Sequence, residues 1–368
     1  MPVKPYLPVR IESSERVDPS SLPNSLSLFA EAEKEKTYID KLHARIELTR
    51  FDPDHPPKDE PWVLKLSDVE CLHLGNIAVV VAALKSGKSS IMAAMVACLI
   101  GAALRDYLGF TSNPALLGAI LFFDTEQSRG DHFRLMAAGL LRAGLDALPS
   151  RLASYSLLLE SPSDRLAAIC HMARKAAADQ GGLLAIFIDG VADLLTDVNS
   201  AEEANAVVDT LHKLATETRC VIITALHLNP GSEKSRGHLG SQIERKAESV
   251  FNLRKEEDII TIVCKPARRQ EITADKAPRF KWDHEAGMFM LTETKAASAD
   301  DKRRAELIEI ADEVFAGRPE LRWKELGEAI KSARGGVSST IEKRIKDMKR
   351  LGVIRWAGNG LYTKGGGL

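Results

Sequence analysis

Continuous apolar runs alternate with amphipathic segments through the middle of the chain. The runs lie at residues 77–83, 119–124, 183–189 and 220–225, with a shorter one at 156–160. Helix-like periodicity separates them at 88–105, 129–146, 162–179 and 201–218. Apolar strands that alternate with helices are typical of an α/β fold whose parallel sheet is covered on both faces. After Glu248 the runs shorten and predict an antiparallel edge at 249–253, 258–264, 279–283 and 288–292.

The first part of the chain, residues 1–60, is predicted to form an arm and a linker helix. Five prolines fall within residues 1–24, which predicts an extended arm. A helical pattern covers 25–48, and a proline-rich connector at 51–61 leads to short strands near Trp62 and Glu70. The helix has two interpretations, because it either packs on its own domain or docks on a neighbouring subunit.

A short turn joins the first long apolar run to the first long helix. Its sequence is Ala83-Leu84-Lys85-Ser86-Gly87-Lys88-Ser89-Ser90. A strand, a loop closed by Gly-Lys-Ser and a helix are the context of a phosphate-binding loop. The turn is therefore predicted to bind the phosphates of ATP, with Lys88 on the β- and γ-phosphates and the Ser89 hydroxyl on Mg²⁺. Ala82 stands where the pattern has its first glycine, a residue with more backbone freedom than alanine.

Composition narrows the class of protein. The chain has 368 residues, of which 45% are hydrophobic and 27% charged, as in globular proteins with one large core. Its five cysteines are scattered without a Cys-x-x-Cys spacing, which favours a reducing compartment over a disulfide framework or a zinc site. No apolar run approaches the length of about 18 residues that spans a membrane. We therefore expect a cytoplasmic protein.

Two carboxylates follow apolar runs and are candidates for the chemistry. Asp189 ends the run at 183–188, where a carboxylate beside the phosphate loop can hold the hydration shell of Mg²⁺. Glu126 follows the run at 119–124 and can take a proton from the water that attacks the γ-phosphate. Asp124 competes for this role, but its position nearer the buried strand favours either a structural role or a contact with the hydration shell of the metal.

Polar residues also follow the next apolar run. His227 lies just past the run at 220–225, where it can sense the γ-phosphate and transmit its loss to the following loop. The loop at 229–242 is long, polar and rich in glycine, and such loops tend to be functional or disordered. It is a candidate for binding a DNA backbone, and its basic side chains are Lys234, Arg236 and His238. The segment after Asp189 is expected to lie beside it.

A second basic cluster follows the run at 258–264. It contains Lys265, Arg268 and Arg269, which are suited to neutralising charge in a phosphoryl-transfer transition state. They are either a solvated basic turn or an arginine finger supplied to the adjacent subunit. Because strand ends meet at one edge of a doubly wound sheet, Lys265 is expected at the same edge as the other candidates.

Together these motifs resemble the RecA-fold ATPases, and among them the RepA-like and DnaB-like hexameric helicases of plasmids and mobile elements. The segments that carry the resemblance are 84–90, 123–126, 186–199, and His227 with 235–241. The resemblance implies a RecA-like P-loop ATPase domain at 61–295. Its implied hydrolytic set is Lys88, Ser89, Glu126 and Asp189, with His227 as the sensor. It further implies that Lys265 acts in trans with Arg268 or Arg269, and that the loop of Arg236 lines a DNA channel.

The last part of the chain, residues 303–366, is similar to a winged helix. Three helical segments near 305–315, 323–330 and 337–350 precede a hairpin with Ala-Gly-Asn-Gly at its turn. From Asp301 onward the balance is 15 basic to 10 acidic side chains, a net of +5. The segment 337–350 is the expected recognition helix, and the predicted DNA contacts are Lys343, Arg344, Lys346 and Arg355. A winged helix that binds protein instead is the alternative.

The expected function is that of a ring-forming ATP-dependent DNA helicase or translocase. The expected partners are single-stranded DNA in a central channel, duplex DNA at the winged helix, further copies in a homo-hexamer, and a separate primase or initiator, with no membrane. Two alternatives stay open. One is a RecA- or RadA-type recombination or repair ATPase that does not unwind DNA, and the other is a nucleotide-switched DNA-binding regulator.

Overall fold

The computed structural model describes residues 25–101, 105–179, 181–229, 232, 235–266, 271–294 and 299–365. The chain divides into two units, Met1–Asp59 and Glu60–Leu368. In the first unit, helix α1 (Ser25–Glu47) confirms the helical pattern predicted at 25–48. Large apolar side chains such as Tyr38, Ile39 and Ile46 are exposed on it. The arm predicted at 1–24 lies outside the described residues.

The second unit is built on a nine-stranded sheet with the order β12-β11-β10-β9-β3-β8-β7-β5-β6. The six strands from β9 to β6 in this order are parallel, and β10, β11 and β12 are antiparallel. The strands are β3 (Ile77–Ala82), β5 (Ala119–Asp124), β6 (Leu152–Ser156), β7 (Leu183–Asp189), β8 (Val221–His227), β9 (Ser249–Glu256), β10 (Ile259–Pro266), β11 (Arg279–Asp283) and β12 (Met288–Leu291). The predicted mixed α/β sheet is therefore confirmed.

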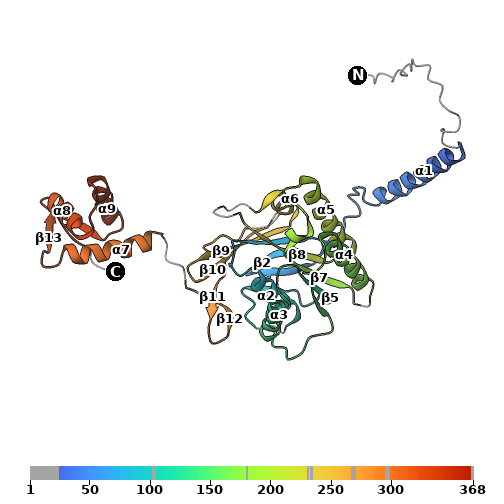
Figure 1. Ribbon diagram of the computed structural model, residues 1–368, viewed down its shortest axis with the longest axis horizontal. Coiled ribbons are helices and arrows are strands. Elements are labelled where there is room, and N and C mark those ends of the chain that lie inside the picture. Colours follow the sequence, from blue (N-terminus) through green and yellow to red (C-terminus); the bar gives the residue numbers. More distant parts are fainter. Residues whose placement is uncertain are drawn as a thin grey trace, which may run out of the picture. The chain divides into compact units, whose positions relative to one another are not determined.

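Helices cover both faces of this sheet (Figure 1). Helices α2 (Lys88–Ile100) and α3 (Arg129–Ala143) pack on one face, and α4 (Pro162–Ala178), α5 (Ala201–Thr218) and α6 (Gly237–Lys246) on the other. The central strand β3 shows why its sequence is apolar throughout. Val80 packs into the core on the side of α2, and Val79 packs into the core on the side of α5. Successive side chains of a strand point to opposite faces.

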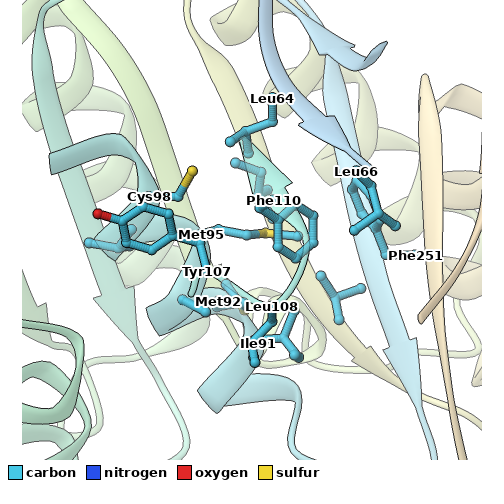
Figure 2. Close-up of a cluster of buried hydrophobic side chains, with 14 of the residues drawn as sticks. Leu64, Leu66, Ile91, Met92, Met95, Cys98, Tyr107, Leu108, Phe110 and Phe251 are labelled. Atoms are coloured by element: carbon cyan, nitrogen blue, oxygen red, sulfur yellow. The ribbon is translucent and has the colours of Figure 1, made fainter. Parts of the chain in front are cut away.

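A second, three-stranded sheet closes the core on the side of α2. Its order is β2-β1-β4, with β1 (Trp62–Leu66), β2 (Val69–His73) and β4 (Phe110–Ser112). Figure 2 shows the contact: Leu64 and Leu66 from β1 face Met95 and Phe110 across one apolar cluster. This cluster anchors α2, whose first turn follows the phosphate loop.

Two predicted element boundaries and the predicted start of the antiparallel edge are wrong. The edge strand β6 lies at Leu152–Ser156 rather than 156–160, where Leu159 is almost fully exposed. Helix α2 ends at Ile100 rather than near 105, because Gly101 adopts an extended backbone that does not continue a helix. The antiparallel edge begins one strand later than predicted, since β9 pairs in parallel with β3.

The last described stretch, residues 299–365, encloses a core of its own and is here called the tail module. It contains α7 (Ala299–Val314), β13 (Glu320–Arg322), α8 (Trp323–Arg334), α9 (Ser338–Arg350), β14 (Ile354–Gly358) and β15 (Leu361–Lys364). The strands form an antiparallel sheet in the order β13-β15-β14. Thirteen buried apolar side chains, among them Leu307, Leu326 and Ile345, hold the helices against this sheet.

Candidate active site

The phosphate loop joins β3 to α2 with two residues in left-handed backbone. Lys85 has a φ of 58°, and Gly87 has a φ of 80° directly before the helix. A Cβ atom on Gly87 would also approach the side chains of Ile260 and Phe289 to 3.3 Å, so this glycine serves both conformation and packing. Ala82, in contrast, is the last regular residue of β3 and pairs with His227. The missing first glycine is therefore tolerated, because no left-handed conformation is needed there.

Lys88 lies at the first turn of α2 and points along the carboxyl edge of the sheet. Its ammonium is buried, and Nζ lies 2.8 Å from Nδ1 of His227. Burial lowers the pKa of Lys88, while the carboxylates of Glu126 and Asp189 oppose that shift. Burial and the nearby positive charge of Lys88 also lower the pKa of His227. The ammonium of Lys88 can thus donate to an imidazole whose protonation is disfavoured.

Asp189 ends β7 and is 1% exposed. Burial raises its pKa to about 6 from an ordinary value of 3.8, and a hydrogen bond with Ser89 partly opposes this rise. Gln127 donates from Nε2 to Oδ2 over 3.2 Å, whereas Oδ1 is buried and has no hydrogen-bond partner among the described residues. A buried carboxylate oxygen without a partner, next to a serine hydroxyl, fits a hydrated Mg²⁺ ion.

Glu126 lies just past β5 and faces the same edge. Its Oε2 atom is 3.7 Å from Nε2 of His227. Burial raises its pKa, and the negative charge of Asp193 adds to that rise, while Lys88 lowers it. A side chain with a raised pKa and about one-third of its surface exposed is suited to exchange a proton with water.

Asp124 organises the turn that carries Glu126. Its Oδ1 atom accepts from the backbone N–H groups of Glu126 and Gln127 over 3.0 and 2.9 Å, and Oδ2 accepts from Nε2 of Gln127 over 2.8 Å. His132 places Nδ1 3.1 Å from Oδ2 and Nε2 2.9 Å from the hydroxyl of Ser154. Both carboxylate oxygens of Asp124 are hydrogen-bonded and its side chain is fully buried. This geometry fits the structural role, one of the roles that its position in the sequence favoured.

Two further residues at this edge, Thr125 and Gln127, were missed by sequence reasoning. Gln127 bridges Asp124 and Asp189, and Thr125 donates to the backbone oxygens of Asp189 and Gly190. The same hydroxyl lies 2.9 Å from Oδ2 of Asp193, so its one proton is shared among these acceptors, and the Asp193 carboxylate lies near Glu126. The only signal in the sequence was adjacency to Glu126, because these bonds join segments about 60 residues apart.

A backbone contact links His227 to the polar loop that follows it. The N–H of Arg236 donates to the carbonyl oxygen of His227 over 3.1 Å, and Arg236 itself is exposed. The backbone of Gly237 packs against Val198, so the segment after Asp189 does lie beside this loop, as predicted. The loop is shorter than predicted, since α6 begins at Gly237 and His238 lies exposed in its first turn. Lys234 lies outside the described residues.

Lys265 does not lie at the edge of the other candidates, and that prediction is wrong. It is exposed in β10, opposite Val250 of β9, which in turn pairs with Val79 of β3. The phosphate loop begins three residues further along, after Ala82. Because β10 runs antiparallel, its end points to the opposite edge of the sheet. Arg268 and Arg269 lie outside the described residues.

A cavity of about 340 Å³ opens beside the phosphate loop between α2, α3 and the β11–β12 hairpin. Ser90 lines it on the loop side, and the rings of Trp282 and Phe289, 5.3 Å apart, line the hairpin side. Buried Arg142 holds the hairpin by donating to the carbonyl oxygen of Phe289. Through Ser90 and Ala93 the cavity borders the first turns of α2.

In the tail module the predicted basic side chains lie on α9 and the β14–β15 hairpin. Lys343, Lys346 and Arg355 are exposed. Arg344 is half-buried and donates to the carbonyl oxygen of Gly335 over 2.9 Å. Three of the four predicted contact residues are thus available at the surface of this module.

The order of the parallel strands, with a Gly-Lys-Ser loop after β3 and acidic residues after β5 and β7, defines a P-loop ATPase with a RecA-like core. The family model AAA_25, described as "AAA domain", matches residues 43–233, which is more than half of the chain. The chain therefore belongs to this family of AAA-type ATPase domains.

Among solved structures, the chain is similar to one described as an "ATPase Domain". The identity is 12% and the TM-score 0.42, and the match covers 60% of this chain and 86% of that one. No curated protein matches the chain. Within the described part of the chain, no helix is long and apolar enough to cross a membrane.

Proposed function

We propose that the protein is an ATP-hydrolysing motor that assembles into a ring, as a hexamer, and moves on single-stranded DNA as the replicative helicase of a plasmid or mobile element. The observation that carries the hydrolytic part is the meeting of Lys88, Glu126, Asp189 and His227 at one edge of the sheet. The proposed domains are an arm with a linker helix at 1–60, the ATPase at 61–295 and a winged helix at 303–366.

The phosphate loop would hold ATP with its backbone N–H groups and the ammonium of Lys88. The backbone donors would come from residues 83–90, and the nucleoside would extend past Ser90 into the cavity lined by Trp282 and Phe289. The Ser89 hydroxyl and the partnerless oxygen of Asp189 would hold Mg²⁺. When bound, this ion neutralises charge on the phosphate oxygens.

Hydrolysis would use Glu126 as the general base. A water oxygen attacks the γ-phosphorus, the bond from that phosphorus to the oxygen shared with the β-phosphate breaks, and the Glu126 carboxylate takes the proton of the water. The raised pKa of Glu126 supports this role, since it makes the carboxylate a better proton acceptor. Asp124 would keep the turn of Glu126 in place through its two bonds to backbone N–H groups.

His227 would report the state of the γ-phosphate. With ATP bound, the ammonium of Lys88 would turn to the phosphates and release the imidazole of His227, from which it lies 2.8 Å in this structure. The shift of His227 reaches Arg236 through the backbone bond between them. Arg236, His238 and Lys234 would contact DNA in the central channel, so that DNA binding and hydrolysis are coupled.

A neighbouring subunit would complete each site. The position of Lys265, at the edge of the sheet away from its own phosphate loop, supports a role in trans. It would act there with Arg268 or Arg269 on the charge that develops at the phosphate oxygens. The basic surface of α9 supports contacts of the winged helix with duplex DNA, and a separate primase or initiator would supply primers.

One set of measurements separates this proposal from its two rivals. We expect single-stranded DNA to stimulate ATP hydrolysis and the protein to displace a strand from a forked duplex. Stimulation without displacement would favour a RecA- or RadA-type ATPase, and slow hydrolysis that DNA does not change would favour a DNA-binding regulator. Lys88→Ala should lower hydrolysis by on the order of 100-fold or more while duplex binding persists. Sedimentation with and without ATP tests the ring.

A further inference from the structure

Three aromatic side chains form a row across one face of the sheet in the tail module. Trp356 of β14 pairs with Tyr362 of β15, and directly opposite residues of paired strands lie on the same face. The ring of Tyr362 lies 5.8 Å from that of Trp323, measured between centroids, at the start of α8. The row therefore runs from α8 across the hairpin to its outer strand.

The outer part of this row is open to solvent. Trp356 is 67% exposed and Trp323 is 39% exposed. Ile354, two residues before Trp356 and on the same face, is buried in the core of the module. The same face of β14 is therefore covered by the core at Ile354 and uncovered at Trp356. Trp356 is exposed because the hairpin extends past the edge of the core. A large exposed indole contributes nothing to the core and is typical of a binding surface.

Positive charge accompanies the row. The ammonium of Lys349, in the last turn of α9, lies 5.4 Å from the ring centroid of Tyr362, within the range of a cation–π contact. Arg322 and Lys324 flank Trp323 and are exposed. The acidic groups next to them are Glu320 and Glu325, and Glu325 accepts from the backbone N–H of Arg322. Over the whole of residues 301–368 the balance remains basic by five charges.

We infer that the aromatic row binds unpaired bases of single-stranded DNA, with Trp356 as the principal stacking side chain. Aromatic faces stack on bases of any sequence, while nearby basic side chains contact the phosphate backbone. Paired bases within a duplex do not expose their faces, so this surface differs in specificity from the basic side of α9. The tail module would then recognise a junction, with duplex DNA on α9 and the separated strand on the hairpin.

This inference rests on the part of the proposed function in which the tail module binds DNA. The test uses the full-length protein without nucleotide and two fluorescent probes, a single-stranded oligothymidine and a blunt hairpin duplex. The variants are Trp356→Ala, Trp356→Phe and the double substitution Lys343→Ala with Lys346→Ala. An oligothymidine that carries 5-iododeoxyuridine locates the contact by photocrosslinking and peptide mapping.

We expect Trp356→Ala to weaken oligothymidine binding by on the order of tenfold, with hairpin binding unchanged. Trp356→Phe should retain most of the affinity, because phenylalanine still stacks, and the crosslink should fall on the peptide that contains Trp356. The double lysine variant should show the opposite pattern and lose hairpin binding. An equal loss on oligouridine would extend the surface to single strands of either nucleic acid.

Unchanged oligothymidine binding by Trp356→Ala, with no crosslink between residues 323 and 364, would overturn the inference. If the lysine variant still loses hairpin binding, the DNA-binding role of the module survives that result. If no variant alters either probe, both ideas fail. A change in sedimentation of Trp356→Ala without a change in DNA binding would assign the row to a protein contact instead.

Discussion

The ammonium of Lys88 contacts the imidazole of His227, with Nζ 2.8 Å from Nδ1, at the edge of the sheet where a γ-phosphate would bind. The two residues are 139 positions apart, and β3 and β8 bring them together because Ala82 pairs with His227. The contact connects Lys88, through His227, to the loop of Arg236, whose N–H donates to the carbonyl oxygen of His227. In the proposed mechanism, nucleotide binding would break or rearrange it.

Replacing His227 is therefore expected to separate hydrolysis from DNA stimulation. In His227→Leu the buried ammonium of Lys88 loses a hydrogen-bond acceptor, which should lower the free energy of unfolding by about 1–3 kcal/mol. The ratio of DNA-stimulated to basal hydrolysis should fall close to one. Urea unfolding and ATPase assays with and without oligothymidine measure the two effects.

The matched control for this variant is His227→Gln. Glutamine offers a side-chain oxygen that accepts from Lys88, so its unfolding free energy should stay near that of the parent protein. Full DNA stimulation in His227→Leu would contradict the proposed coupling, whatever the effect on stability.

Glu126→Gln should abolish hydrolysis while ATP binding is kept. The amide cannot take a proton from water, but it has nearly the size of the carboxylate. In the parent protein the pKa of Glu126 is raised above its ordinary value of 4.5. As the pH decreases, the rate should therefore begin to fall at a higher pH than it would with an ordinary glutamate. Single-turnover hydrolysis across pH measures this. A pH profile that is unchanged in a residually active Glu126→Gln protein would assign the titration to another group.

Asp189→Asn should stabilise the nucleotide-free protein at pH 7 and impair magnesium-dependent hydrolysis. Burial raises the pKa of Asp189 to about 6, above its ordinary value of 3.8. The folded state then binds more protons than the unfolded state between these values, so the free energy of unfolding falls as pH rises through this window. The ionised carboxylate costs up to about 3 kcal/mol at pH 7, which the neutral amide avoids.

Thermal unfolding of both proteins at pH 4 and pH 7 tests this argument. The difference between Asp189→Asn and the parent should be small at pH 4, where the carboxyl group of the folded protein is neutral, and larger at pH 7. A variant that is less stable than the parent at pH 7 would show that the hydrogen bonds of Ser89 and Gln127 outweigh burial.

The sequence predicted the central strands well and the edge strand poorly, for one physical reason. The strand at Leu183–Asp189 is buried on both faces and therefore apolar throughout. The edge strand at Leu152–Ser156 is only partly covered, and its residues include Tyr155, which stacks on Phe123. The more apolar segment that follows is a turn with exposed leucines. At this edge the apolar run thus marked the turn and not the strand.

At the candidate site, single residues after strands were predictable and the contacts between them were not. Lys88, Glu126 and Asp189 stand next to apolar runs, so their shared edge followed from the alternation of strands and helices. The bridge that Gln127 makes between Asp124 and Asp189 depends on strand pairing and side-chain direction. Lys265 was misplaced because the strand at 258–264 was predicted to be antiparallel, yet its end was assigned to the edge where the parallel strands end.

The placement of Lys265 leads to a test of action in trans. Lys88→Ala and Lys265→Ala should each be inactive alone. In a mixed ring, some interfaces place the phosphate loop of a Lys265→Ala subunit next to a Lys88→Ala subunit. Such an interface holds an intact Lys88 from the first subunit and an intact Lys265 from the second. Mixing the two proteins should therefore restore hydrolysis at roughly a quarter of the interfaces if assembly is random and each interface is heterologous.

The control for this experiment is a mixture of Lys88→Ala with Glu126→Gln. Lys88 and Glu126 of one subunit lie at the same edge of that subunit's sheet, so they belong to the same site. Each subunit in this mixture lacks one of the two, and no interface holds a complete site. Activity in the first mixture and none in the second would place Lys265 in the neighbouring site. No activity in either, with mixed rings verified by sedimentation, would return Lys265 to the role of a solvated basic residue.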